Sequence, residues 1–380
     1  MKVKIRPLLV LWHRWFGLFG AIWLLAMAVT GVILVFYSEL DQALNSDLYF
    51  VEPQGAPLPV SKWIESAESA KPNSYVNILH LPDGTDSAAV LQLRQQPGVT
   101  LDHDHPSQLF VDPYTANVLG ERELGKLSLD RRNIMNVFYG LHMDLLLGEG
   151  MFLFLGLIAF LWIIDHVVSL LLSFPTLSKW KRSFRVRFSK GGYKRLFDLH
   201  RAGGVWLFPI TMMFAVSSLY FIWYEPVVKL VDSVSPITPR HIFLLPNQEQ
   251  AQIDTPISMA AAHDIAKRAS GGAGVDMMRF FPRKNAYELR LFDPRDIDPH
   301  GRRMMVIDAF KGEVLSDRHI TEGGAGNQFI AWQYPLHSGK GFGWPGRMLI
   351  FFSGLVLIVV IVTGVKIWLR KRILHRKIAP

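Results

Sequence analysis

The sequence predicts a membrane protein in which a bundle of four transmembrane helices carries two extracytoplasmic α+β domains, built as a tandem repeat. The 380 residues are 50% hydrophobic, and four apolar runs lie at about residues 11–37, 151–174, 205–224 and 348–369. Each run approaches or exceeds the roughly 18 residues that mark a membrane span. Two segments of mixed polarity, each of about 100 residues and long enough for a small domain, separate the runs in pairs.

The first apolar run resembles a secretory signal because Lys2, Lys4 and Arg6 precede it. Its length exceeds the roughly 7 to 15 apolar residues of a signal peptide, and no clear cleavage site with small residues follows. We therefore expect a retained helix whose N-terminus lies in the cytoplasm.

Basic residues predict the orientation of the spans. They concentrate at the N-terminus, between the second and third runs, and in the C-terminal tail. The group between the runs is Lys179, Lys181, Arg182, Arg185, Arg187, Lys190, Lys194 and Arg195. The group in the tail is Lys366, Arg370, Lys371, Arg372, Arg376 and Lys377. The positive-inside rule assigns all three groups, and so both termini, to the cytoplasm. Most of the net charge of +9 therefore contacts anionic membrane lipid rather than nucleic acid.

A repeated motif relates the two extracytoplasmic segments. Residues 110–122 parallel residues 306–318, and both read as a strand, a tight turn and a strand, with Asn117 or Gly312 at the turn position that needs a positive φ. Helix candidates precede the motifs at residues 59–70 and 256–269. Each half of the chain thus reads as span, α+β domain, span.

These patterns divide the chain into eight segments. They are the cytoplasmic N-terminus with span one (1–37), the first domain (38–139), span two (140–174), a basic cytoplasmic loop (175–198), span three (199–224), the second domain (225–336), span four (337–369) and a basic cytoplasmic tail (370–380).

Four histidines stand at matching ends of these spans. His13 and His200 each open an apolar run behind basic residues, and His142 and His337 each precede a run with glycines between. Histidine is costly at membrane depth and usually marks a functional site. Facing helices of a bundle can supply the two axial imidazoles of a b-type haem. The sequence therefore predicts two non-covalent bis-histidine haems, one held by His13 and His200 and the other by His142 and His337.

A fifth histidine leaves two interpretations open. His166, preceded by Asp165, lies a full helix length along span two, at the depth of His13. Span four has Gly364 at the equivalent point, so the repeat predicts no ligand there. Either His166 replaces His13 or His200 as a haem ligand, or Asp165 and His166 handle protons for a quinol.

A helix length between the two haem sites would leave the irons far apart for direct electron transfer. Gly148 and Gly150 would shorten that distance if they break span two and bring His142 inward.

Other side chains near the histidines have two interpretations each. Arg14 and Arg201 follow the first pair and would contact either haem propionates or lipid headgroups. Residues 332–334 precede His337 and would form either the floor of a substrate pocket or interfacial aromatic packing. The segment 102–106, with His103 and His105, is either a transient iron site or a solvated loop.

The motifs together resemble a known family. Residues 112–119 and their counterpart at Asp308 resemble the PepSY module, and the openings Leu11-Trp12-His13-Arg14 and Leu199-His200-Arg201 resemble those of PepSY-associated transmembrane-helix proteins. That family includes haem-containing inner-membrane reductases of ferric siderophores, of the FoxB type. The resemblance implies that His13, His142, His200 and His337 bind haem iron, and that the protein reduces a ferric siderophore in the periplasm and releases ferrous iron.

Absent motifs constrain the remaining chemistry. The chain has no cysteine, which excludes disulfides, iron–sulfur clusters and covalently attached haem. It also lacks a dinucleotide fingerprint and a P-loop. The electron donor must then be a separate cytoplasmic protein or a membrane quinol. The alternative function is a non-redox membrane protein whose extracytoplasmic domains bind a peptide, a peptidase or a siderophore.

Overall fold

The computed structural model describes the backbone of residues 5–97, 107–174, 176, 180–189 and 191–378, and the side chains as far as residue 373. The chain forms two compact units. A helical unit comprises residues 1–36, 138–230 and 333–380, and a sheet unit comprises residues 37–137 and 231–332.

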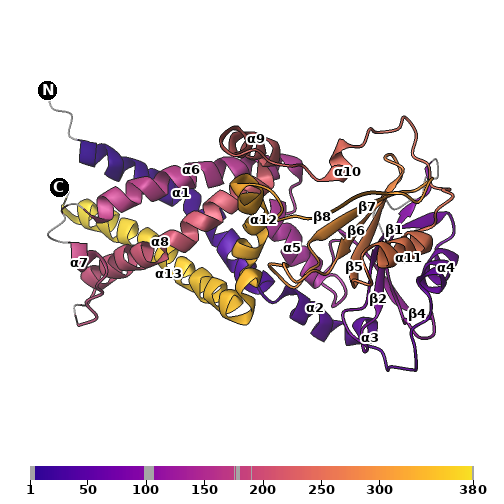
Figure 1. The fold of residues 1–380 in the computed structure, drawn as a ribbon. Helices are drawn as coiled ribbons and strands as arrows, with labels where there is room; N and C mark the ends of the chain where they lie inside the picture. The colour runs from indigo at the N-terminus through magenta and orange to yellow at the C-terminus, as the bar shows by residue number, and fades with distance from the viewer. Residues whose placement is uncertain (1–4, 98–106, 175, 177–179, 190, 379–380) are drawn as a thin grey trace. The chain divides into compact units, whose positions relative to one another are not determined.

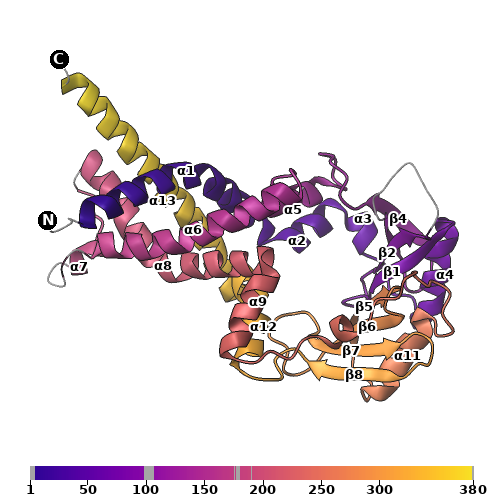
Figure 2. The same cartoon turned by 90° about the horizontal axis from the view of Figure 1, so that it is seen from above.

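Four long helices make up most of the helical unit: α1 (Ile5–Leu34), α6 (Glu149–Ser173), α8 (Tyr193–Ile222) and α13 (Gly343–Ile378). They lie side by side in both views (Figure 1, Figure 2). In the described part of the chain, these four are long and apolar enough to cross a membrane, in agreement with the four spans predicted from the sequence. The helix α13 continues through the basic tail because lysine and arginine are good helix formers.

The second span is not one continuous helix through His142: it is interrupted at Gly148, one of the two glycines at which a break would bring His142 inward, whereas Gly150 lies inside α6. The helix α5 (Ile134–Asp144) ends before α6 begins, and Leu145 and Leu146 have φ angles of 56° and 59°. Gly148, at a φ of 78°, completes the break. His142 and His166 therefore lie on different helices, and a distance counted along a single helix does not apply to them.

The same interruption precedes the fourth span. His337 lies on α12 (Ala325–Ser338), and a short 3-10 turn (Lys340–Phe342) separates this helix from α13. Gly339 and Gly343, with φ angles of 74° and 58°, flank the turn. In both halves, the histidine thus lies on a separate short helix just before the span.

The sheet unit contains one antiparallel sheet of eight strands. Its spatial order is β4-β3-β2-β1-β5-β6-β7-β8. The strands are β1 (Ser74–His80), β2 (Ala89–Gln95), β3 (Ser107–Val111), β4 (Val118–Glu123), β5 (Val275–Phe281), β6 (Ala286–Leu291), β7 (Arg303–Asp308) and β8 (Val314–His319).

In place of two separate domains, the structure joins both extramembrane segments through β1 and β5. Leu79 pairs with Met278 at the centre of this antiparallel contact. Each of these strands would otherwise be an edge strand with unpaired backbone groups, which are prone to pair with another chain. Pairing them with each other completes the sheet within one molecule.

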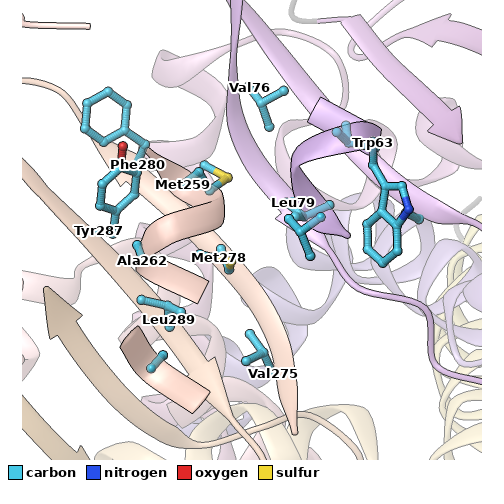
Figure 3. Close-up of a cluster of buried hydrophobic side chains, with 14 of the residues drawn as sticks. Trp63, Val76, Leu79, Met259, Ala262, Val275, Met278, Phe280, Tyr287 and Leu289 are labelled. Carbon is cyan, nitrogen blue, oxygen red and sulfur yellow. The ribbon is translucent and has the colours of Figure 1, made fainter. Parts of the chain in front are cut away.

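Two helices cover one face of the sheet, α4 (Val60–Ala70) from the first segment and α11 (Met259–Ala269) from the second (Figure 1). Their apolar sides form one core with the alternating inward residues of the strands. Figure 3 shows Trp63 and Leu79 of the first segment in this core, with Met278 and Leu289 of the second. The indole nitrogen of Trp63 also donates to the backbone oxygen of Pro113 at 3.0 Å.

The turns of the repeated motif are alike, but one residue differs from the expectation. The positive φ falls on Ala116 (58°) and Gly312 (71°), and not on Asn117. In the first turn the carboxylate of Asp112 accepts from the backbone nitrogen of Tyr114, and Ala116 donates to the backbone oxygen of Asp112. This local hydrogen bonding holds Ala116 in a conformation that alanine rarely adopts alone.

A buried ion pair ties the helix α2 (Tyr37–Leu44) to β4. The Arg122 guanidinium donates to the Asp41 carboxylate at 2.9 Å, to the Gln108 side-chain oxygen at 2.6 Å and to the Tyr49 hydroxyl at 3.0 Å. The remaining short helices are α3 (Ser46–Tyr49), α7 (Trp180–Ser183), α9 (Tyr224–Val234) and α10 (His241–Leu244).

Candidate functional site

The helical unit brings four histidines together as two pairs. The ring centroids of His13, on α1, and His200, on α8, lie 6.0 Å apart with an interplanar angle of 48°. Those of His142, on α5, and His337, on α12, lie 6.5 Å apart at 67°. These are the pairings that the repeat predicts.

The two pairs lie at opposite ends of the bundle. His13 and His200 stand near the starts of α1 and α8, whereas the second pair contacts Thr30 and Ser217 near the ends of the same helices. Thr30 follows His13 by 17 positions, and Ser217 follows His200 by the same number. At 1.5 Å per residue, about 25 Å separates the two levels. This is shorter than the roughly 36 Å that one unbroken helix from His142 to His166 would span, because the chain breaks at Gly148.

Strong hydrogen-bond acceptors anchor the first pair. The Nδ1 atom of His13 lies 3.0 Å from each carboxylate oxygen of Asp165, on α6. The Nδ1 atom of His200 lies 2.8 Å from the backbone oxygen of Val360, on α13. All four long helices therefore contribute to this site.

Hydroxyl groups anchor the second pair. The Nδ1 atom of His142 lies 2.9 Å from Thr30 Oγ1, and that of His337 lies 2.7 Å from Ser217 Oγ. Both hydroxyls already donate to backbone oxygens one turn earlier, at 2.8 Å for Thr30 and 2.7 Å for Ser217. Each hydroxyl oxygen is therefore the acceptor, and each imidazole donates from Nδ1.

Two glycines allow the rings to approach the long helices. A Cβ atom on Gly364, in α13, would lie 2.8 Å from Cε1 of His200. A Cβ atom on Gly31, in α1, would lie 3.1 Å from Cε1 of His142. Ordinary contacts of this kind are 3.4–4 Å, so any larger residue would displace the rings.

The donor set fits axial ligation of iron. In all four rings the anchored nitrogen is Nδ1, so iron would bind at Nε2, and an anchored second nitrogen is the usual arrangement of a metal-binding histidine. An imidazole nitrogen binds a metal at about 2 Å and its ring centroid lies about 1 Å further, so two rings on one iron have centroids about 6 Å apart. The separations of 6.0 Å and 6.5 Å agree with this value.

A family model described as the PepSY-associated TM region matches residues 10–371 of the chain. The chain belongs to the PepSY-associated transmembrane family. No curated protein matches it. The family match covers all four paired histidines and most of both units of this PepSY-associated protein.

His166 of the PepSY-associated protein lies apart from both pairs. Its Nδ1 atom is 2.7 Å from the backbone oxygen of Trp162, and its Nε2 atom is 2.8 Å from Thr211 Oγ1. Its ring packs against Trp162 and Phe208. Both nitrogens therefore have partners within the protein, which is the arrangement of a buried structural histidine.

The two arginines next to the first pair differ in their surroundings. Arg14 is exposed and lies over the ring of Trp15 at 5.4 Å. Arg201 pairs with the buried carboxylate of Asp198 at 3.1 Å and donates to the backbone oxygen of Arg182 at 2.7 Å. Hydrogen bonds within the protein therefore fix the Arg201 side chain, whereas the Arg14 side chain is exposed at the surface of the helical unit.

The other predicted candidates lie on α12, one turn before His337, or outside the described part. Residues 332–334 are on α12, where the Tyr334 ring lies 5.9 Å from the Lys340 ammonium. His103 and His105 lie outside the described residues. Within the residues that are described, no group of three or more histidine or acidic side chains is arranged to hold a metal ion.

Sequence reasoning missed the partners of the paired histidines. No motif in the sequence singles out Thr30, Ser217 or Gly31, and the sequence places Asp165 next to His166 although its side chain contacts His13. The one available signal for the two hydroxyl groups was their equal spacing, 17 residues after His13 for Thr30 and 17 residues after His200 for Ser217. No sequence signal identifies the Val360 backbone oxygen, because any residue supplies one.

Proposed function

We propose that this protein is a di-haem b oxidoreductase of the bacterial inner membrane, which passes electrons outward and reduces a ferric siderophore in the periplasm. The observation that carries the proposal is the presence of two histidine pairs with iron-compatible separations, each anchored through Nδ1, at opposite ends of one apolar bundle. Solvated or merely interfacial histidines would not need such anchoring.

The roles of the residues follow from their contacts. His13 and His200 would hold one haem and His142 and His337 the other, while Asp165, Val360, Thr30 and Ser217 fix the direction of each ring. Haem bound at these pairs supplies a one-electron ferric–ferrous couple. Gly364 and Gly31 leave room for the rings beside the helices.

The charge distribution supports the direction of transfer. The start of α1, the segment before α8 and the end of α13 are rich in lysine and arginine, and the positive-inside rule assigns them to the cytoplasm. The pair His13–His200 would then face the electron donor, and the pair His142–His337 would face the periplasm.

The electron balance of the reaction is simple. Each ferric ion takes one electron, so a quinol that gives up two electrons and two protons would reduce two ferric chelates; a separate cytoplasmic reductant is the other candidate donor. Ferrous iron carries less charge than ferric iron, so anionic oxygen ligands attract it less strongly and release it more readily.

Two measurements on purified protein test the proposal. The first is the absorption spectrum with the haem-to-protein ratio, which should show two low-spin b-type haems per chain. The second is anaerobic reoxidation of dithionite-reduced protein by ferric siderophore, by iron-free siderophore or by buffer, with a ferrous-specific chelator present. Reoxidation only with the ferric chelate supports a reductase. Equal rates in all three would reject it and favour a membrane protein that binds a peptide, peptidase or siderophore.

Ligand variants test the histidine assignment. His142→Ala or His337→Ala should remove one haem and leave the other. The matched control is His166→Gln, which retains hydrogen-bonding capacity and should keep both haems, because His166 already has partners at both nitrogens. A haem lost only in the control would assign the ligand role to His166.

A further inference from the structure

We infer that Asp165 holds the His13–His200 site at a lower reduction potential than the His142–His337 site, so that electrons move downhill toward the second pair. This inference rests on the proposed function and adds the residues that give the transfer its direction. The observation behind it is the unequal set of Nδ1 acceptors, a carboxylate and a backbone carbonyl at the first pair and two hydroxyls at the second.

Asp165 is a buried carboxylate inside the bundle. Its side chain is 9% exposed, and both of its oxygens lie 3.0 Å from Nδ1 of His13. Within the described side chains, no lysine or arginine forms an ion pair with it. Asp198, the other buried carboxylate at this end, is instead neutralised by Arg187 and Arg201. The negative charge of Asp165 therefore acts on His13.

A carboxylate that accepts the Nδ1 proton makes the imidazole a more basic ligand. A more basic ligand and a nearby negative charge both stabilise ferric iron relative to ferrous iron, because the ferric ion carries the larger positive charge. Asp165 therefore lowers the reduction potential of iron bound by His13 and His200.

The second pair lacks a comparable group. Thr30 and Ser217 are neutral, and their own protons are committed to backbone oxygens, so each accepts one hydrogen bond from an imidazole without adding charge. In the described part of the chain, no carboxylate lies within hydrogen-bonding distance of His142 or His337. Iron at this pair is therefore easier to reduce.

The residue that corresponds to Asp165 in the other half of the chain is uncharged. Asp165 precedes His166, and Thr363 precedes Gly364 at the corresponding place in α13. The Thr363 hydroxyl donates to the backbone oxygens of Val359 and Val360 at 2.7 Å and 3.0 Å. One half thus places a charge at this level of the bundle, and the other half places a neutral hydroxyl.

With haem bound at both pairs, one electron would pass from the iron held by His13 and His200 to the iron held by His142 and His337. The quinol or cytoplasmic donor would reduce the first iron again, and the ferric chelate would take the electron from the second. The difference in potential makes this step downhill, since the free energy change is −nFΔE.

Anaerobic spectroelectrochemical titration of the purified full chain tests the inference. Two midpoints are expected, and the His142→Ala variant should retain only the lower one. Asp165→Asn removes the charge and should raise the lower midpoint potential by at least about 59 mV. A shift of this size corresponds to a tenfold change in the ratio of oxidised to reduced iron. Asp165→Glu, which keeps the charge, should retain most of the difference between the two midpoint potentials. Ser217→Ala should leave the lower midpoint in place.

The matched control is Asp254→Asn, an equal change of charge at an exposed carboxylate of the sheet unit, and it should move neither midpoint potential. If Asp165→Asn fails to fold, His142→Ala still shows which wild-type midpoint potential belongs to the His13–His200 site, and therefore which of the two sites has the lower potential. A higher midpoint in His142→Ala, or an unchanged midpoint in Asp165→Asn, would overturn the inference and leave the haem proposal standing. Protein without haem would instead overturn the proposed function.

Discussion

Gly364→Ala should weaken haem binding at the first histidine pair and leave the second pair intact. The added methyl carbon would lie 2.8 Å from Cε1 of His200, whereas ordinary contacts begin at 3.4 Å, so the ring must move by about 0.6 Å or more. His200 is anchored to Val360 at 2.8 Å, and a shift of this size away from α13 lengthens that hydrogen bond toward its limit.

The expected magnitude follows from these two effects. Overpacking costs about 1–3 kcal/mol, and a weakened hydrogen bond costs about 0.5–1.5 kcal/mol. Each 1.4 kcal/mol is a factor of about ten in affinity, so haem binding at this pair should weaken tenfold or more. The assay is the haem-to-protein ratio during competition with a haem acceptor such as apomyoglobin.

Gly204→Ala is the matched control for this prediction. Gly204 lies on α8, one turn after His200, and a Cβ atom there would meet nothing within 4 Å. This variant should retain two haems, and alanine even favours the helix by about 1 kcal/mol. If Gly364→Ala and Gly204→Ala lose haem equally slowly, His200 does not bind a haem in the position described.

Three further predictions concern orientation and the sheet unit. A reporter fused after Pro380 should be cytoplasmic and one inserted near Gln95 should be periplasmic; the reverse result would invert the proposed direction of electron transfer. Burial, with a smaller effect of Arg290, lowers the pKa of His80 from 6.5 to about 4. The unfolded chain therefore binds this proton first as the pH falls, so stability should decrease between pH 6.5 and 4 by up to about 3 kcal/mol, and His80→Asn should remove this dependence from chemical denaturation curves. Arg122→Ala leaves the buried Asp41 carboxylate without its cationic partner, with only Asn45 and Tyr49 still donating to it, and should lower the free energy of unfolding by about 3–5 kcal/mol in the same assay.

The sequence alone was sufficient for features that depend on local composition. A run of apolar residues is recognisable whatever it packs against, so four spans were predicted and the structure has four candidate spans. The repeated motif predicted a strand, turn and strand in each half, and β3–β4 and β7–β8 form these hairpins. The equivalent placement of His13 and His200, and of His142 and His337, also predicted which rings would meet.

Tertiary structure decided the features that depend on residues far apart in the chain. The pairing of β1 with β5 joins segments about 200 residues apart, and no local pattern distinguishes it from two separate sheets. Likewise, the contact between Asp165 and His13 joins residues 152 positions apart. A sequence shows directly only which residues are neighbours along the chain, and the chain neighbour of Asp165 is His166. Sequence determines which side chains stand at each end of the bundle; packing of the four helices determines which acceptor each imidazole meets, since that depends on the rotation of each helix about its own axis.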